Sequence, residues 1–389
     1  MLKTIDPDTR FKIKENFINC SSVKDFHTLI NETGILIFGN TYVPISYKSF
    51  VYHSYHSNNS HRYSSFEILK RNGKKRRIHK PTGTLNAILK IFNVILQCTY
   101  PCHNSAFGFV PDRSIVNNAS LHVDRKFVYN IDLVDFFYSF NQNQIKLLFI
   151  GKPYGFFQTK ESLAFFLSIL LTHRDSSIRE FAFLPQGSPA SPYVTNMLCV
   201  RMDRRLSALA KRYNAKYTRY ADDITFSGDV DFIHHEEFNA ELFRIVENEN
   251  LAINSSKTRL FHKAQRQVVT GLTVNKKVNV ARVAIKDLRV YVHFANKYGL
   301  EKSMLNYKSN LNRNIKNIDH YVEIINGKFQ YFSMVNNSDS LKKLRKKWNT
   351  LIIKSLRDSN TRNSEDFVKA VSLVGLKRAL NLYNSGKTN

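Results

Sequence analysis

Two adjacent carboxylates stand in the middle of the chain, in the segment KYTRYADDITFS at residues 216–227. The alternation of residue types on both sides predicts a β-hairpin with Asp222 and Asp223 at its tip. Neighbouring carboxylates repel one another, and a divalent cation relieves that repulsion; Mg²⁺ binds one or two carboxylates together with substrate phosphates. An Asp-Asp pair in a turn is otherwise more often a solvated turn or a helix cap.

A third carboxylate lies about ninety residues upstream, in FVYNIDLVDFF at residues 127–137. Asp132 interrupts the apolar run of a predicted strand, and Asp135 falls near the start of the helix that follows. Three carboxylates from two adjacent strands hold two ions roughly 3.5–4 Å apart, a clamp suited to in-line attack of a hydroxyl on a phosphate. We therefore expect Asp132, Asp222 and Asp223 to be catalytic ligands of two Mg²⁺ ions.

The charge of the chain indicates an acidic partner. Its 389 residues include 58 Lys plus Arg and 31 Asp plus Glu, a net charge of +27, and 43% of residues are hydrophobic. This composition is typical of a folded basic protein that binds nucleic acid or an anionic membrane. The longest apolar run, residues 163–171, is half of the roughly 18 residues that span a bilayer, so we expect no membrane partner. With no secretory signal and only four cysteines, we expect a cytoplasmic location.

The elements that position these residues differ along the chain. Residues 62–80 hold eight Lys or Arg and one Glu, and predict a hairpin with strands at 65–69 and up to Ile78, stopped by Pro81. Between 126 and 280, short β-type segments alternate with helix-type ones, which is typical of an α+β unit. Residues 281–389 hold 21 basic and 8 acidic residues, with apolar positions at helical spacing at Leu341, Leu344, Trp348, Leu351 and Ile352.

Five motifs occur in the order and approximate spacing of reverse transcriptase motifs: FVYNIDLVDFF, LPQGSPASP, RYADD, INSSKT and VTGL. The NAxxH element at residues 118–122 and the VTG triplet at 269–271 further resemble the bacterial retron reverse transcriptases. The resemblance covers about 63–280. It implies an α+β right-hand polymerase with fingers at 61–125, a palm of antiparallel sheet and helices at 126–280 with finger insertions, and a basic helical thumb at 281–389. The role of residues 1–60 stays unknown.

The resemblance also implies roles for single residues around the incoming nucleotide. Phe137 matches the gate that excludes a ribonucleotide 2′-hydroxyl, although Phe136 or Phe137 could instead be an ordinary core residue. Gln186 matches a contact to the nucleotide and template, and Arg76 the fingers arginine that holds the triphosphate, assisted by Lys70 or Arg71. Lys257 matches a lysine near the leaving pyrophosphate. Each of these basic residues taken alone is more often a surface charge.

Four further residues match the retron elements. Asn118 and His122 are spaced i and i+4, which suits hydrogen bonds to RNA, and the alternative is a helix cap plus a packed histidine. Thr270 and Gly271 lie at a predicted strand bend, where glycine lets a primer or RNA backbone approach closely. Two candidate zinc clusters, one at His53, His56 and His61 and one at Cys98, Cys102 and His103, lack a complete ligand set.

The implied function is an RNA-directed DNA polymerase. Such an enzyme binds a cognate structured non-coding RNA, uses deoxynucleotides, and starts from a guanosine 2′-hydroxyl to leave branched RNA-linked single-stranded DNA (msDNA). A separate effector protein in antiphage defence is the further partner. Two alternatives stay open: a defence reverse transcriptase without a dedicated RNA, and an inactive RNA-binding scaffold.

Overall fold

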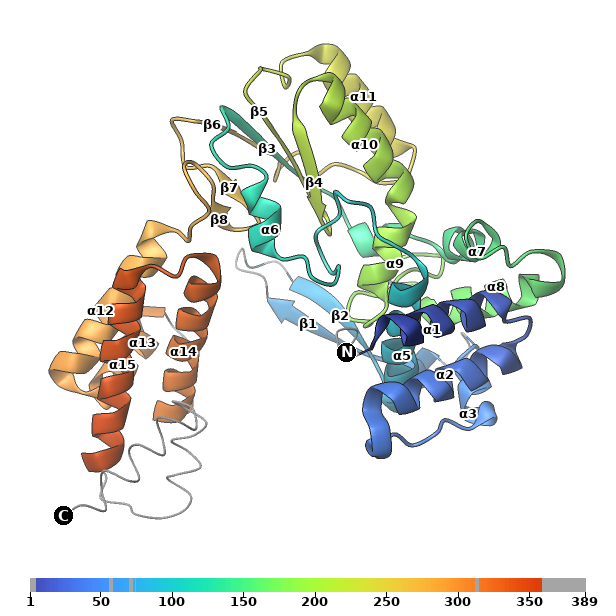
Figure 1. Cartoon of the computed structure of the whole chain (residues 1–389), viewed down its shortest axis with the longest axis horizontal. Coiled ribbons are helices and arrows are strands. Elements are labelled where there is room, and N and C mark those ends of the chain that lie inside the picture. The colour runs from blue at the N-terminus through green and yellow to red at the C-terminus, as the bar shows by residue number, and fades with distance from the viewer. Residues whose placement is uncertain (1–4, 56–58, 70–72, 74, 312–314, 359–389) are drawn as a thin grey trace. The chain divides into compact units, whose positions relative to one another are not determined.

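The computed structural model describes residues 5–55, 59–69, 73, 75–311 and 315–358. The chain divides into two compact units, Met1–Thr270 and Gly271–Asn389, and we describe each by itself (Figure 1). We call them the first unit and the second unit. The second unit begins at Gly271, ten residues before residue 281, where the sequence predicted the thumb to begin.

A four-stranded antiparallel sheet carries the predicted acidic residues. Its order is β4-β5-β3-β6, with the bounds Lys216–Tyr220, Asp223–Gly228, Phe127–Asp132 and Arg259–His262. Helices α10 (Val200–Arg212) and α11 (Glu236–Glu247) cover one face (Figure 1). Phe226 of β5 packs edge-on against Phe238 of α11, with ring centroids 5.4 Å apart. The alternation in the strands thus buries an aromatic layer on one face, as the α+β prediction requires.

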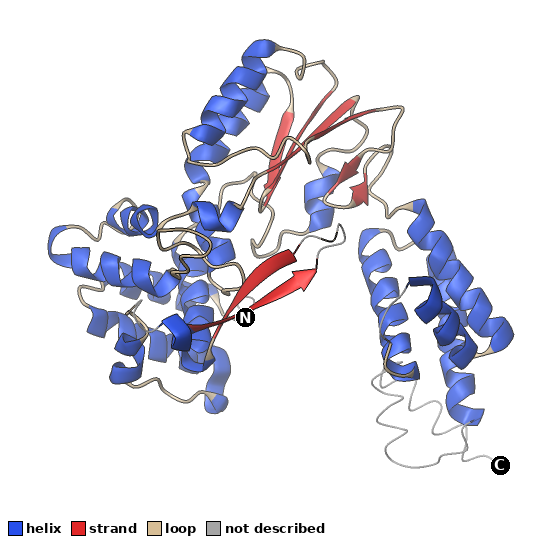
Figure 2. Ribbon diagram, turned by 180° about the vertical axis from the view of Figure 1, so that it is seen from behind, coloured by secondary structure: helices blue, strands red, loops and turns tan. Residues whose placement is uncertain are grey.

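The basic hairpin predicted near residues 62–80 is present as β1 (Tyr63–Leu69) and β2 (Lys75–Pro81). The strands are antiparallel, and Tyr63 lies opposite Pro81. Figure 2 shows this hairpin apart from the four-stranded sheet. The return strand runs past the predicted end at Ile78 and ends at Pro81, because proline cannot donate a further ladder hydrogen bond.

Helices make up the rest of the first unit. Their bounds are α1 Pro7–Asn19, α2 Val23–Phe38, α3 Tyr47–Tyr52, α4 Asn59–Arg62, α5 Gly83–Thr99, α6 Ile115–Ser120, α7 Gln142–Ile150, α8 Glu161–Leu171 and α9 Ser191–Leu198, with short 3-10 turns at Gly39–Thr41, Phe136–Ser139 and Gln158–Lys160.

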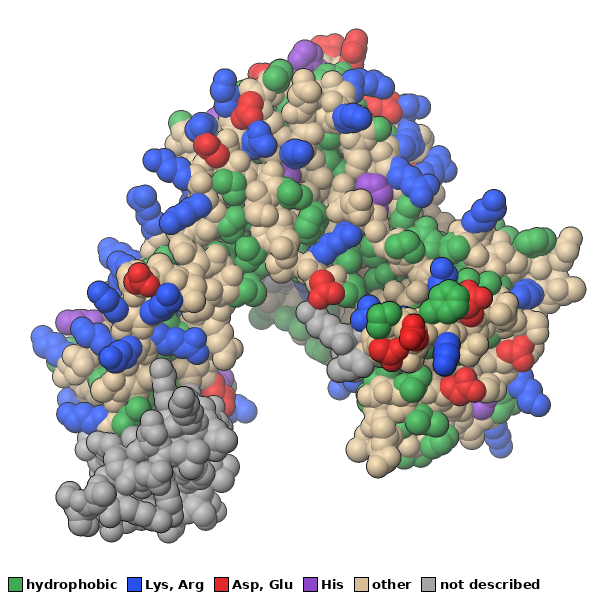
Figure 3. Space-filling view, in the orientation of Figure 1, with side chains coloured by type: hydrophobic (Ala, Val, Ile, Leu, Met, Phe, Trp, Pro, Cys, Tyr) green, Lys and Arg blue, Asp and Glu red, His purple; other side chains and the backbone are tan. Residues whose placement is uncertain are grey.

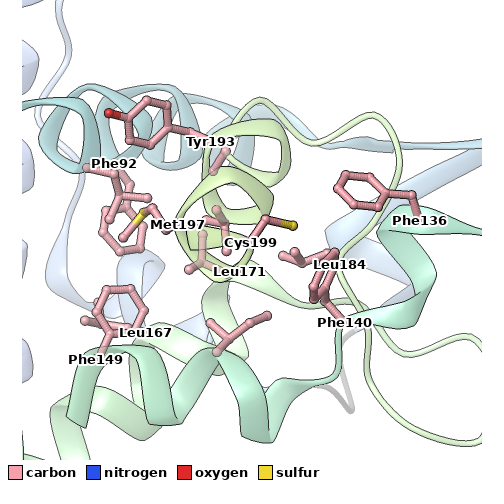
Figure 4. Packing of buried hydrophobic residues seen from close by; sticks show 14 of the residues in the cluster. Phe92, Phe136, Phe140, Phe149, Leu167, Leu171, Leu184, Tyr193, Met197 and Cys199 are labelled. Atoms are coloured by element: carbon pink, nitrogen blue, oxygen red, sulfur yellow. The ribbon is translucent and has the colours of Figure 1, made fainter. Parts of the chain in front are cut away.

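Helices α1, α2 and α3 contribute side chains to the core of the first unit. Phe17 of α1 is fully buried, and its ring contacts the rings of Phe92 and Phe149 at centroid distances of 6.0 and 6.3 Å. Figure 4 shows Phe92 and Phe149 in the cluster that continues to Tyr193 and Met197. The N-terminal segment therefore completes the hydrophobic core on which the fingers-side helices pack.

The second unit starts at the turn before β8 (Leu272–Thr273), which pairs with β7 (Val268–Val269). Among its described residues, four helices follow: α12 Arg282–Tyr298, α13 Leu300–Leu311, α14 Ile318–Val335 and α15 Asp339–Asp358. Trp348 of α15 is fully buried and donates a hydrogen bond of 3.0 Å to Asn326, which confirms the helical pattern predicted there. Figure 3 shows Lys and Arg side chains over the surface of these helices. In the described part of the chain, every helix is too short or too polar to cross a membrane.

Candidate active site

The structure brings the three predicted carboxylate residues to one end of the sheet. Asp132 ends β3 directly opposite Asp223, the first residue of β5. Ala221 and Asp222 form the turn between β4 and β5, and Ala221 adopts a left-handed φ of 58° that makes the turn tight. The backbone N–H of Leu133 donates to the Asp222 carbonyl at 3.2 Å, which ties the turn to the neighbouring strand.

The carboxylates disfavour one another's charge. Partial desolvation of its carboxyl group, together with the negative charges of Asp222 and Asp132, raises the pKa of Asp223 to about 6. Desolvation and the charge of Asp132 also raise the pKa of Asp222, against the opposing effect of Lys257 and Arg76. A site that raises the pKa of two acids in this way gains free energy when a cation binds.

Asp132 is held by two side chains from the segment after α11. Lys257 Nζ lies 2.7 Å from Asp132 Oδ2, and Asn254 Nδ2 donates to the same oxygen at 3.1 Å. The Asn254 backbone N–H also donates to the Asp132 carbonyl at 2.8 Å. Lys257 was predicted from the sequence near the pyrophosphate, and here it neutralises Asp132. Asn254 was not singled out, although it belongs to the INSSKT motif.

The hairpin tip rests on a buried ion pair that the sequence analysis missed. Arg219 of β4 and Asp203 of α10 are both fully buried, and two guanidinium nitrogens lie 2.8 Å from the two carboxylate oxygens. Tyr217 donates a third hydrogen bond to Asp203 at 2.7 Å. Arg219 Nη1 also donates to the Ala221 carbonyl at 3.1 Å, so this pair connects α10 to the turn that holds Asp222.

The fingers hairpin, β1 and β2, contacts the nucleotide loop, the LPQGSPASP segment at residues 184–192 that holds Gln186. Arg76 is exposed on β2, and its positive charge acts to lower the pKa of Asp222. The backbone N–H of His79 donates to the Gln186 carbonyl at 2.8 Å. At Gly187, φ is +121°, and an added Cβ would lie 2.7 Å from the His79 carbonyl oxygen, so only glycine lets the two backbones approach. Lys70 and Arg71 lie outside the described residues.

Phe136 and Phe137 have different surroundings. Phe136 is 4% exposed and belongs to the core, whereas the half-buried Phe137 packs on it with ring centroids 5.6 Å apart. The core alternative therefore fits Phe136, whereas Phe137 lies at the margin of the core and is only partly buried. Asp135, with φ of 46°, lies 3.4 Å from the guanidinium of Arg179.

The structure buries both residues of the NAxxH element. Asn118 is 1% exposed in α6, and His122 is fully buried just after that helix. The two ring nitrogens of His122 lie 2.7 Å from the hydroxyls of Ser227 and Thr218, and burial lowers its pKa to about 3. His122 thus joins β4 to β5 as a neutral imidazole, and the packed-histidine alternative describes it better than direct RNA contact.

Thr270 and Gly271 form the two-residue turn between β7 and β8. Both have positive φ, 47° and 81°, the conformation of a tight hairpin turn. Thr270 Oγ1 donates to the carbonyl of Ile115 in α6 at 3.3 Å, and an added Cβ on Gly271 would meet nothing within 4 Å. The turn is therefore anchored through Thr270 and open at Gly271.

The sheet, the facing aspartates and the adjoining fingers hairpin define the class of the protein, a right-hand polymerase. Residues 68–280 match the family described as Reverse transcriptase (RNA-dependent DNA polymerase), and the chain belongs to this family.

Relatives support the narrower assignment to the bacterial retron branch. The chain is 36% identical over 242 residues to the Retron Mx65 reverse transcriptase of Myxococcus xanthus, covering 59% of this chain and 55% of the relative. It is 31% identical over 239 residues to the Retron Ec86 reverse transcriptase of Escherichia coli, covering 60% and 69%. The chain spans about half the length of the Myxococcus relatives that it matches. A telomerase structure from Candida albicans aligns with a TM-score of only 0.39 at 14% identity, covering 83% of this chain and 63% of that one.

Proposed function

We propose that this protein is an RNA-directed DNA polymerase that copies part of a cognate structured non-coding RNA into RNA-linked single-stranded DNA. The observation that carries the proposal is the register of the sheet, in which Asp132 faces Asp223 beside the Asp222 turn. These three residues fall within the part of the chain that matches the reverse transcriptase family.

The site suits two Mg²⁺ ions, which Asp132, Asp222 and Asp223 would hold. The fit rests on the raised pKa values of Asp222 and Asp223, since crowded, partly desolvated carboxylates favour a hard divalent cation with oxygen ligands. Such ions supply charge stabilisation to the attacking 3′ oxygen and to the leaving pyrophosphate.

The side chains around the triad prepare it for a nucleotide. Asn254 holds the Asp132 carboxylate in place, and Lys257 neutralises it before substrate enters. An ammonium at this position can later meet the phosphate charge of a bound deoxynucleotide. Arg76 on the hairpin presents a planar guanidinium suited to triphosphate oxygens. The partly buried Phe137 would exclude the 2′-hydroxyl, and Gln186 would contact the nucleotide and template.

The basic charge supports an RNA partner. Residues 281–389 alone hold 21 basic against 8 acidic residues, which suits many phosphate contacts to a folded RNA and its RNA–DNA product. As in the sequence analysis, we propose that the product acts with a separate effector protein in antiphage defence.

The direct test is primer extension on an RNA template with deoxynucleotides and Mg²⁺. We expect the double variant Asp222→Asn, Asp223→Asn to lose activity by about 1000-fold or more, because several kcal/mol of transition-state charge stabilisation disappear. Asp231→Asn, which alters an exposed acid paired with His234, is the matched control and should retain activity. Equal activity of wild type and the double variant would overturn the proposal, and an inactive wild type that still binds RNA would favour the scaffold alternative.

A further inference from the structure

Three potential metal ligands meet on the fingers side of the first unit, and none of them belongs to the aspartate triad. His79 of β2, His173 and Asp175 each offer one ligand atom, and these atoms all lie within 4.8 Å of one another. His79 and His173 are buried, at 0% and 5% exposure, and Asp175 is half-buried. The nucleotidyl-transfer mechanism uses none of the three side chains.

The imidazole of His79 is oriented as metal-binding histidines are. Its Nδ1 lies 2.8 Å from the hydroxyl of Ser65 on the paired strand β1. Its Nε2 is fully buried and has no hydrogen-bond partner among the described residues. A ligating histidine typically uses one nitrogen for the metal and the other for an orienting hydrogen bond. A buried nitrogen without a partner is costly, and a bound cation would remove that cost.

The other two residues are held at fixed positions. Two backbone hydrogen bonds of 2.9 Å join His173 to Phe183, and its ring centroid lies 4.9 Å from that of His79. Asp175 Oδ1 accepts from the backbone N–H and hydroxyl of Ser177, and Oδ2 lies 3.3 Å from Arg77 Nη1. The Asp175 carboxylate is thus oriented by its neighbours. Its Oδ2 is the oxygen that would bind a cation, because its contact to Arg77 is long.

We propose that His79, His173 and Asp175 form a Zn²⁺ site, with water as the fourth ligand. Two imidazoles and one carboxylate suit Zn²⁺, whereas the all-carboxylate triad suits Mg²⁺. The site joins strand β2 to the segment after α8. Because the His79 N–H also donates to the Gln186 carbonyl, the ion fixes the fingers hairpin against the nucleotide loop.

Cobalt provides the test, because tetrahedral Co²⁺ absorbs visible light and replaces Zn²⁺. The full chain is stripped with EDTA, supplied with excess Mg²⁺ to occupy the triad, and titrated with Co²⁺. We expect one equivalent to bind with tetrahedral absorption, and Zn²⁺ to displace it. His173→Gln should weaken binding at least about tenfold. Two matched variants should keep the absorption. Asp222→Asn changes the triad, and His234→Gln changes an exposed histidine that pairs with Asp231 outside the proposed site.

A second variant tests the site without altering a buried histidine, because replacing a buried histidine can unfold the protein by itself. Asp175→Asn changes the most exposed of the three ligands, and its circular dichroism should match wild type while the Zn²⁺-induced rise in melting temperature is lost. Absence of tetrahedral absorption in wild type, its persistence in His173→Gln, or its loss in Asp222→Asn would each overturn the proposal.

Discussion

The buried pair of Arg219 and Asp203 gives the sharpest prediction about the hairpin tip. Replacing Asp203 by Asn keeps its size but removes the charge that compensates a fully buried guanidinium. Removing one partner of a buried ion pair costs about 3–5 kcal/mol. We expect the free energy of unfolding of Asp203→Asn to fall by that amount, measured by urea denaturation.

The same change should act on catalysis, because Arg219 also donates to the Ala221 carbonyl. A displacement of about 1 Å at a reacting centre costs about 100-fold in rate. At a temperature where Asp203→Asn stays folded, we expect kcat per folded molecule to fall by about 10- to 100-fold, with little change in KM for deoxynucleotide. The Mg²⁺ concentration for half-maximal activity should rise, because Asp222 and Asp223 shift together.

Arg244→Gln is the matched control. Arg244 of α11 is exposed and pairs with Glu241 three residues earlier on the same helix, so its loss should cost less than about 1 kcal/mol and leave kcat unchanged. If Asp203→Asn were as active per folded molecule as wild type, with the same Mg²⁺ requirement, the role of the pair in positioning the turn would be refuted, even if stability fell.

Three further predictions concern single residues. Burial lowers the pKa of His122 to about 3 from an ordinary 6.5, so the stability that neutral His122 contributes is full above pH 6.5 and declines as the pH falls. We expect the free energy of unfolding, measured by urea denaturation, to fall by about 2 kcal/mol between pH 7 and pH 5 because of this residue. His122→Gln should abolish that pH dependence, and His234→Gln should leave it in place. Phe137→Ala should raise incorporation of ribonucleotides relative to deoxynucleotides by about tenfold or more in single-nucleotide extension, and an unchanged ratio would exclude Phe137 as the gate. Gly187→Ala forces a Cβ to 2.7 Å from the His79 carbonyl at a φ of +121°, so we expect about 1–3 kcal/mol lower stability and a higher KM for deoxynucleotide. Gly39→Ala, at a positive φ of 57° with nothing within 4 Å of the added Cβ, should leave that KM unchanged.

Local patterns predicted the elements that carry the triad. The hairpin around Asp222 and Asp223 follows from period-two alternation next to a tight turn, which depends only on neighbouring residues. The helix around Trp348 and the basic hairpin ending at Pro81 follow for the same reason. The proximity of Asp132 to Asp223 was inferred from the three carboxylates that a two-metal clamp requires, and the order of motifs shared with reverse transcriptases implied the same three residues.

Long-range contacts escaped the sequence analysis. The i, i+4 spacing of Asn118 and His122 suited RNA contact as well as a packed histidine. The hydroxyls of Ser227 and Thr218 that decide between the two lie on strands about a hundred residues away. Likewise, nothing local marks Arg219 and Asp203 as partners. A polar residue in a periodic pattern is compatible with burial whenever a distant segment supplies its hydrogen bonds.

The N-terminal helices illustrate the same limit. Residues 1–60 match no motif, yet Phe17 packs in the centre of the first unit's core. An apolar residue shows that burial is favourable without showing against which element it packs.

The central claim is most directly tested by the product made in bacteria that express this chain together with the DNA that flanks its gene, where the proposal places the non-coding RNA. Total nucleic acid is treated with ribonuclease, and the remaining DNA is resolved on a denaturing gel before and after debranching. We predict a single-stranded DNA of one length that shifts on debranching and disappears in the variant Asp222→Asn, Asp223→Asn. The same DNA in cells that contain only this double variant would contradict the account.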